Sequence, residues 1–454
     1  MARDVSDAMP IVSRDALVAW FEAGCKAPSA FRLGTEHEKF GFHRKDLSPV
    51  AYGDIRCLLD GMGAALAWQP IMDGEALIGL FDEVGGGAIS LEPGGQFELS
   101  GAPVADVHAT AAELALHLAT LKTIADPLGI GFASLGMSPK WTLAQTPVMP
   151  KQRYRIMRNY MPKVGTRGLD MMFRTCTVQV NLDFASEADM VKKLRVSLAL
   201  QPIATALFAN SPFTQGRPNG LLSARSEIWR DTDNQRAGML PFAFEPGMGF
   251  ERYVDYALDV PMYFVKRGDI YHDVAGASFR DLLAGNMHNA LAGEQATMSD
   301  WANHLGTIFP EVRLKRYLEM RGADAGPVSH LNALPAVFTG LFYDEAALDG
   351  AWQLAKDWSA AQRQLLRDEV PRLALKAVIG GRSVRDVARD MLALSRAGLA
   401  RRARRNAQGL DETHYLDPLD AIVDAGRTHA EVMLEHFHGD WHGSVDPAFA
   451  ACAL

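Results

Sequence analysis

The chain has 454 residues, of which 48% are hydrophobic and 22% are charged, and this composition is typical of a globular protein. Its net charge of -8 argues against general nucleic-acid binding, which needs a basic surface. This charge does not exclude a local basic pocket for an anionic small molecule. No run of about 18 uncharged apolar residues occurs, and the first residues lack the apolar core of a secretory signal. We therefore expect neither a nucleic-acid partner nor a membrane span.

The cysteines are few and scattered, and no two of them form a CxxC pair. They are Cys25, Cys57, Cys176 and Cys452. This pattern fits a reducing compartment and argues against a zinc site or a disulfide framework. It predicts a cytoplasmic protein.

The first part of the chain alternates helical and strand-like segments. Apolar residues at helical spacing predict amphipathic helices over residues 13–25 and 106–128. The glycines of residues 92–96 predict a tight turn that returns the chain into a strand at residues 97–99. Other strands are predicted over residues 32–43, 64–72, 76–81 and 88–92.

The second part begins with a strand over residues 174–184 and a helix over 187–210 that is irregular at Pro202. Residues 211–285 are rich in proline and glycine, and such stretches in a compact enzyme usually line a site. Further helices are predicted over residues 345–357, 359–369, 383–404 and 417–438. Because no repeat or linker is found, we predict one α+β catalytic body over residues 1–454, mostly helical from about residue 343 to 454.

Four of the strand-like segments carry polar side chains on every second residue, which is the most informative feature of the sequence. Side chains two apart on a strand share a face. The pairs are Glu36 with Glu38, Gln96 with Glu98, Gln179 with Asn181, and Glu319 with Arg321. A solvated sheet face would explain one such strand, but repeated carboxylates repel unless a cation neutralises them, and hard oxygen ligands suit Mg²⁺. Four strands together predict a site for a metal and a nucleotide.

A nucleotide would have to be held without a glycine-rich loop, because the chain has neither a GxxxxGKS/T nor a GxGxxG motif in the required context. Arginine forks bind phosphate and carboxylate with two prongs. Taken singly, each arginine is more often a surface ion-pair partner. Arg321 is an exception because it shares a face with Glu319. The other candidates for holding ATP are Arg174, at the start of the polar strand, and Arg230 and Arg236, which lie with Arg225 in the loop-rich stretch.

Long stretches of the chain resemble the plant-type glutamate–cysteine ligase family, which also has bacterial members. They are GTEHEKFGF (34–42), LEPGGQFELSGAP (91–103), MRNYMPK (157–163), RTCTVQVNLD (174–183), LQPIA (200–204), YALDVP (256–261) and RYLEMRG (316–322). The resemblance runs from about residue 12 to residue 449. It implies a glutamine-synthetase-like fold, in which helices back a curved, mainly antiparallel sheet that forms a funnel.

The resemblance also implies an activity. ATP would phosphorylate the γ-carboxylate of L-glutamate, and the amine of L-cysteine would displace the phosphate. The products would be γ-glutamylcysteine, ADP and phosphate, which is the first step of glutathione biosynthesis. The implied partners are these small molecules and Mg²⁺, and the implied assembly is a monomer or a homodimer.

By the same resemblance, site residues can be assigned roles. The metal ligands would be Glu36, Glu38, Glu98 and Glu319. Arg321 would stabilise the transferring phosphoryl group, and Gln179 and Asn181 would face substrate and nucleotide. Arg225 and Tyr160 would recognise glutamate and cysteine, respectively.

One departure from the family concerns redox control. Plant members carry cysteines that form redox-sensitive disulfides, and the corresponding positions here are Ala111, Val274, Asn289 and Asn332. We therefore expect no thiol switch.

Three other functions fit part of the pattern. A ligase of the same fold could use a different amine acceptor. A non-catalytic relative should have lost some metal carboxylates, yet all four are present. A metal-dependent hydrolase would need no ATP.

Overall fold

The centre of the computed structural model, which describes residues 7–288 and 291–454, is a nine-stranded sheet. Its strands are β1 (Leu33–His43), β2 (Gln69–Asp73), β3 (Ala76–Phe81), β4 (Ala88–Leu91), β5 (Gln96–Ser100), β6 (Ile130–Ala133), β7 (Thr177–Leu182), β14 (Val312–Leu314) and β15 (Leu318–Asp324). Their order is β14-β15-β7-β1-β5-β4-β3-β2, and β6 pairs with the far end of β1. All these pairings are antiparallel, so the predicted α+β class with a mainly antiparallel sheet is confirmed.

One face of the sheet is apolar and covered by helices. These are α2 (Tyr52–Leu66), α3 (Val107–Ala125), α6 (Glu187–Leu207) and α11 (Val328–Phe342). The alternation of β7 predicts this face, because Val178, Val180 and Leu182 are fully buried against it. Cys176, just before β7, is fully buried as well.

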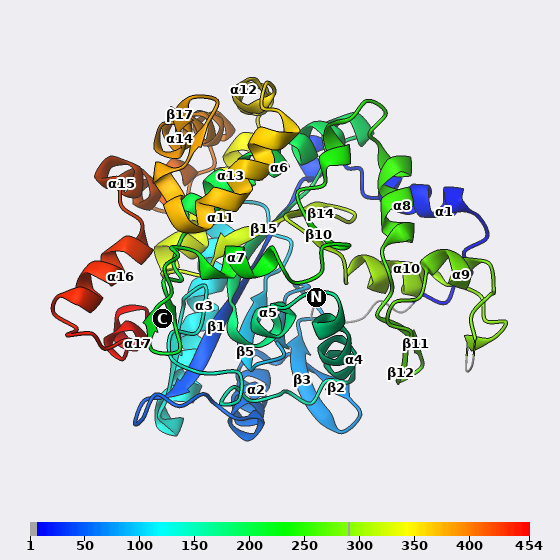
Figure 1. Ribbon diagram of the computed structural model, residues 1–454, viewed down its shortest axis with the longest axis horizontal. Helices are drawn as coiled ribbons and strands as arrows, with labels where there is room; N and C mark the ends of the chain where they lie inside the picture. The colour runs from blue at the N-terminus through cyan, green and yellow to red at the C-terminus, as the bar shows by residue number, and fades with distance from the viewer. Residues whose placement is uncertain (1–6, 289–290) are drawn as a thin grey trace.

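The opposite face carries shorter helices. They are α4 (Gln152–Tyr160), α5 (Gly168–Arg174) and α7 (Ala224–Trp229), which lie in front of the sheet in Figure 1. The polar residues of the sheet point toward this side, so the space between the strands and these helices is where a site can form.

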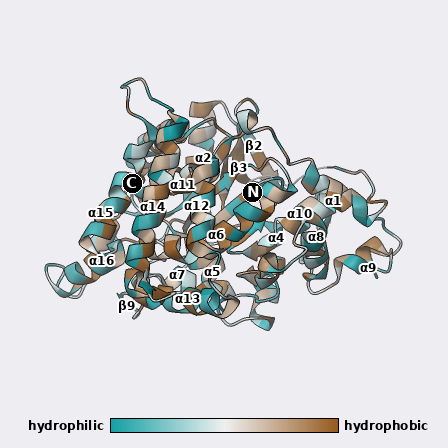
Figure 2. Cartoon of the chain, turned by 90° about the horizontal axis from the view of Figure 1, so that it is seen from above, coloured by the Kyte–Doolittle hydropathy of each residue, from teal (hydrophilic) through white to brown (hydrophobic). Residues whose placement is uncertain are grey.

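The remaining helices form two groups, which Figure 2 shows from above. The first group is α12 (Glu345–Ala355), α13 (Ala360–Leu373), α14 (Val384–Arg402), α15 (Asp417–Ala425), α16 (His429–His438) and α17 (Pro447–Ala451), of which α15 and α16 lie at one end of the molecule. At the other lie α1 (Arg14–Glu22), α8 (Phe250–Asp259), α9 (Phe279–Leu283) and α10 (Met298–Leu305). Short strands complete the fold: β8 (Phe213–Thr214), β9 (Arg217–Pro218), β10 (Ala237–Gly238), β11 (Phe264–Arg267), β12 (Ile270–Asp273), β13 (Phe309–Pro310), β16 (Val378–Ile379) and β17 (Arg382–Ser383). Within the described ranges, none of the helices is both long and apolar enough to cross a bilayer.

Several predicted boundaries are wrong, each for a local reason. The strand predicted over 64–72 begins only at Gln69, because α2 continues to Leu66 and ends at Ala67 in the left-handed conformation. The helix predicted over 417–438 breaks at Gly426, whose φ is 65°. Pro202 lies inside α6, where a proline removes one backbone hydrogen bond without ending this long buried helix.

Candidate active site

The register of the sheet brings the four polar alternations onto one face. Glu38 on β1 lies opposite Glu98 on β5. On the other side of β1, Glu36 lies opposite Gln179. Between β7 and β15, Asn181 lies opposite Glu319. Residues far apart in the sequence are therefore neighbours across four adjacent strands.

A cavity of about 130 Å³ lies over this polar row. It is lined by residues that include Glu36, Glu38, Glu92, Gln96, Glu98, Gln179, Arg225, Arg313 and Arg321. Ligand sites usually measure roughly 300–1,000 Å³, so side chains around the cavity must move to admit ATP with two amino acids.

Three carboxylates meet in the lining of the cavity. Among the described residues, Glu38, Glu92 and Glu98 offer oxygen atoms that all lie within 4.8 Å of one another. Burial raises the pKa of Glu38 well above its ordinary value, and the charges of Glu92 and Glu98 raise it further. Burial and Glu98 also raise the pKa of Glu92. Such crowding is costly without a cation, and three converging carboxylates are a donor set that fits Mg²⁺.

These carboxylates are oriented by neighbouring donors. Ser90 donates to Glu98 at 2.7 Å, and Tyr154 donates to Glu92 at 3.1 Å. The backbone N–H of Thr177 donates to Glu38 at 3.0 Å. Sequence reasoning missed Glu92, because this residue lies past the end of β4 and is not part of an alternation. The sequence did contain one indication of its role: Glu92 begins the turn that leads back to Glu98.

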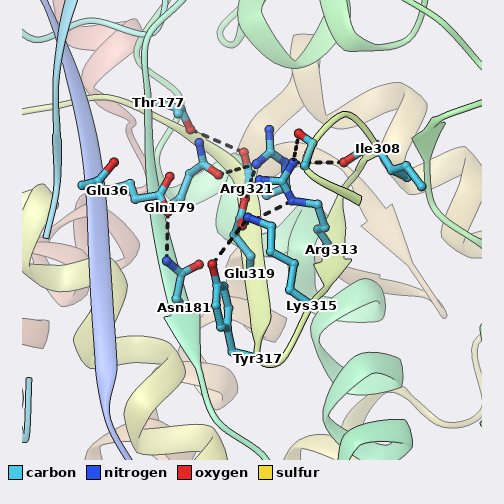
Figure 3. A network of polar contacts seen from close by, with 12 residues as sticks. Glu36, Thr177, Gln179, Asn181, Ile308, Arg313, Lys315, Tyr317, Glu319 and Arg321 are labelled. Carbon is cyan, nitrogen blue, oxygen red and sulfur yellow. Dashed lines mark hydrogen bonds and ion pairs between the residues drawn. The ribbon is translucent and has the colours of Figure 1, made fainter. Parts of the chain in front are cut away.

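Glu319 lies in a different environment, among cations (Figure 3). Its carboxylate accepts from Arg313 Nη2 at 2.6 Å, from Lys315 Nζ at 2.9 Å and from Arg321. Burial opposes ionisation, but Arg313, Lys315 and Arg321 hold the pKa of Glu319 well below its usual range. The carboxylate is already compensated by protein cations, in contrast to Glu38 and its neighbours.

Arg313 and Lys315 were also missed from the sequence. They are two residues apart, and Arg313 lies opposite Glu319 on β14. The rule that residues two apart on a strand share a face identified Glu319 with Arg321. Applied to pairs of basic residues, the same rule would have identified Arg313 with Lys315. Both side chains are buried, at 4% exposure each.

A β-bulge aims Arg321 into the cavity. Met320 and Ala323 pair with Val180 and Val178, so Arg321 and Gly322 together oppose a single residue of β7. Arg321 Nη1 donates to Gln179 Oε1 at 2.7 Å. At Gly322, a Cβ would lie 2.6 Å from the side-chain amide of Gln201, so a larger residue at the bulge would have to displace this buried side chain.

Glu36 and Asn181 form a separate contact beside the cations. Asn181 Nδ2 donates to Glu36 Oε1 at 2.9 Å. Glu36 lines the cavity but does not belong to the group of three carboxylates. Its position places a further negative charge near Arg313, Lys315 and Arg321.

Arg225 reaches the cavity from α7. It is buried, with 3% exposure, and its Nη2 donates to the carbonyl oxygen of Arg321 at 2.9 Å. Burial lowers the pKa of Arg225, and the charges of Asp324 and Glu38 oppose that effect.

Among the predicted site residues, Glu319 and Asn181 do not line the cavity but contact residues that do, Arg321 and Glu36. Four others do not line it either. Arg174 is the last residue of α5 and not the start of a strand, and its guanidinium pairs with Asp170 one turn earlier. Arg230 pairs with Glu227 and Asp368. Arg236 is fully buried against Asp233, and Tyr160 packs against Tyr263. The roles predicted for Arg174, Arg230 and Arg236 in nucleotide binding, and for Tyr160 in cysteine binding, remain predictions.

Comparison with known proteins identifies the family. Residues 32–451 match the family described as glutamate-cysteine ligase family 2. The chain belongs to this family. It is 55% identical over 442 residues to a glutamate–cysteine ligase of Nicotiana tabacum, covering 97% of this chain and 83% of the relative. The enzyme of Arabidopsis thaliana is 54% identical over 438 residues, covering 96% and 82%. The predicted family is confirmed.

A solved structure shares the fold of this ligase-family chain. It is a glutamate–cysteine ligase of Francisella tularensis in complex with AMP, with a TM-score of 0.56 and 11% identity, covering 90% of this chain and 85% of that one. At this identity the likeness concerns the fold alone.

The relatives correct one prediction. The glutamate–cysteine ligases of Nicotiana tabacum, Solanum lycopersicum and Arabidopsis thaliana are all named chloroplastic. The cytoplasmic location predicted from the scattered cysteines is therefore wrong, because a cysteine pattern reports reducing conditions and not a particular compartment.

Three of the four positions that carry the thiol-switch cysteines in plant members lie in the described part of the chain. All four cysteines are free. Ala111, Val274 and Asn332 occupy described positions, whereas Asn289 lies outside the described residues.

Proposed function

We propose that this chain performs its ligase reaction in the cavity over the polar row, with Mg²⁺ held by Glu38, Glu92 and Glu98. The prediction of a glutamate–cysteine ligase is confirmed by the family match and by relatives that carry this name. ATP, L-glutamate and L-cysteine are its proposed substrates. We also retain the predictions of one catalytic body over residues 1–454 and of a monomer or homodimer.

The charge distribution of the cavity supports this assignment. Forming an acyl phosphate brings a carboxylate against a triphosphate, so several negative charges must be neutralised at once. When bound, Mg²⁺ would supply positive charge that polarises phosphate oxygens. The carboxylates Glu38, Glu92 and Glu98 line the cavity, and the cations that surround Glu319 lie on the same sheet face.

The residues of the chain divide the reaction between them. Arg321, fixed by Gln179 and Glu319, donates to the phosphoryl group while it passes from ATP to the γ-carboxylate of glutamate. Arg225 binds a carboxylate of glutamate. The roles of Glu36 and Glu319 as metal ligands stay predictions, and Asn181 orients Glu36. The amine of cysteine then attacks the acyl carbon, and phosphate leaves with the oxygen taken from glutamate.

The group of Glu38, Glu92 and Glu98 carries this proposal, because three converging carboxylates repel one another without a cation and ATP arrives with Mg²⁺. The experiment is to incubate the enzyme with ATP, Mg²⁺ and glutamate and to offer a panel of amines. We expect γ-glutamylcysteine and one phosphate per product with cysteine. Faster turnover with a different amine would instead support the alternative ligase, and phosphate release without any amide product would support a hydrolase.

A further inference from the structure

A buried carboxylate lies behind the cavity at the end of β15. Asp324 is 1% exposed and is three residues beyond Arg321. It accepts hydrogen bonds from the backbone N–H of Asn210 at 3.0 Å, from Ser211 Oγ at 2.6 Å and from Ser223 Oγ at 2.9 Å. The reaction described above does not use it.

The two serines connect Asp324 to the first turn of α7. Ser211 Oγ accepts from the backbone N–H of Arg225 at 3.3 Å. Ser223 Oγ, the N-cap of this helix, accepts from the backbone N–H of Ser226 at 3.2 Å. A helix of six residues is too short to be stable alone, so its position depends on such anchors.

This helix presents two side chains to the cavity, Arg225 and Trp229. The guanidinium of Arg225 is attracted by three carboxylates, those of Asp324, Glu38 and Glu311. Without Asp324, only the attraction to Glu38 and Glu311 would remain, and Arg225 would shift from its present position toward these carboxylates.

The surroundings leave Asp324 little freedom. Gly136 packs against it so closely that a Cβ there would lie 2.3 Å from Asp324 Cγ. The carboxylate is therefore held at one position relative to both serines. This rigidity is what an anchor for a catalytic-site helix requires.

We propose that Asp324 is a positioning residue for glutamate binding: through Ser211 and Ser223 it fixes α7 so that Arg225 meets a substrate carboxylate. The inference rests on the proposed function, because it takes Arg225 as the group that binds glutamate.

The test compares steady-state kinetics of Asp324→Asn, Ser211→Ala and Ser223→Ala with the wild type. Asparagine keeps the size of the side chain but loses the negative charge. Its NH₂ group replaces one carboxylate oxygen and cannot accept a hydrogen bond, so at least one of the N–H and O–H donors loses its acceptor. We expect Asp324→Asn to raise the KM for glutamate roughly tenfold with little change in kcat, as expected for a lost charged hydrogen bond. Each serine variant should raise the same KM by a smaller factor.

A matched control is Glu412→Gln. Glu412 is also fully buried and accepts from a backbone N–H, that of Val107, at 2.8 Å, but it does not line the cavity. A loss of stability alone would affect both carboxylate variants in the same way. Only the Asp324 and serine variants should change the KM for glutamate.

A double-mutant cycle shows whether Asp324 acts through Arg225. In an Arg225→Ala background, Asp324→Asn should add little further increase in the KM for glutamate, because the residue it positions is gone. An unchanged KM in Asp324→Asn, or additive effects in the cycle, would overturn the proposal. If Asp324→Asn does not fold, an unchanged KM in both serine variants would overturn it.

A wild-type enzyme that makes no γ-glutamylcysteine would refute the proposed function separately. In that case, calorimetric binding of glutamate to the wild type and to the same variants still decides the positioning role of Asp324. Weaker binding in the Asp324 and serine variants would support it, and equal binding would overturn it.

Discussion

Arg321 on the bulge of β15 donates to Gln179 on β7 across a distance of 2.7 Å, and the same guanidinium contacts Glu319 two residues earlier on its own strand. The arginine is thus held by two neighbours, and it lines the cavity. Pre-organised cations of this kind stabilise charge that develops only in the transition state.

Replacing Arg321 by lysine should lower kcat by about 10² to 10³ while the KM for ATP changes little. Lysine keeps the charge but loses the planar two-pronged donor that matches a phosphoryl group in transit; in Arg321 a single nitrogen, Nη1, contacts both Gln179 and Glu319. Steady-state kinetics with varied ATP provide the measurement. Arg402→Lys is a control, because Arg402 pairs with Glu412 outside the cavity. A normal kcat with a raised KM for ATP would make Arg321 a ground-state contact of the nucleotide.

Glu98→Gln and Glu92→Gln should each raise the Mg²⁺ concentration for half-maximal activity by about 10- to 100-fold or more. Each change removes one charged oxygen ligand from the three converging carboxylates. The measurement is activity against free Mg²⁺ at fixed MgATP. Glu113→Gln serves as the control, since Glu113 accepts from the N–H of Ala102 at 2.8 Å and does not line the cavity. An unaltered Mg²⁺ requirement in both variants would place the metal elsewhere.

Stability should fall between neutral and acidic pH partly because of His304. Burial lowers the pKa of this histidine from 6.5 to about 4. The unfolded chain therefore binds a proton at a higher pH than the folded chain, and acidification from pH 7 to 5 should cost about 2 kcal/mol at this residue.

Urea unfolding at pH 7 and pH 5 checks this prediction. In His304→Gln the decrease in unfolding free energy between these pH values should be smaller than in the wild type by that amount. His438→Gln, a change at an exposed histidine, is the matched control variant. An equal decrease in the wild type and His304→Gln would rule out the contribution of His304.

Activity and apparent mass should be insensitive to thiol reagents. Burial raises the pKa of Cys176 well above its ordinary value, so little thiolate forms there. All four cysteines are free. Activity assays and gel filtration after incubation with dithiothreitol or a mild oxidant should give the same results. A mapped disulfide that changes the rate several-fold would contradict the expectation.

The alternation of polar residues was a reliable guide because a strand has a period of two, whatever its partners are. It correctly placed Glu36 with Glu38 and Gln179 with Asn181 on one face of the sheet. Which strands are neighbours, and so which pairs meet, depends on the order of strands across the sheet and could not be derived from the period.

The residues that were missed depend on tertiary contacts. Glu92 reaches Glu98 through a turn, and Asp324 reaches α7 through two serines more than 100 residues away in sequence. Arg230 and Arg236, whose role in nucleotide binding stays a prediction, pair locally and do not line the cavity. Their carboxylate partners lie three residues before them, and this local pairing competes with a role at a distant site.

The most direct test of the reaction follows oxygen. With glutamate labelled by ¹⁸O in its γ-carboxylate, the reaction of ATP and cysteine should transfer one labelled oxygen to each phosphate released, because a γ-glutamyl phosphate is broken at its acyl carbon. Mass spectrometry of the phosphate provides the measurement. Unlabelled phosphate formed together with γ-glutamylcysteine would contradict the account.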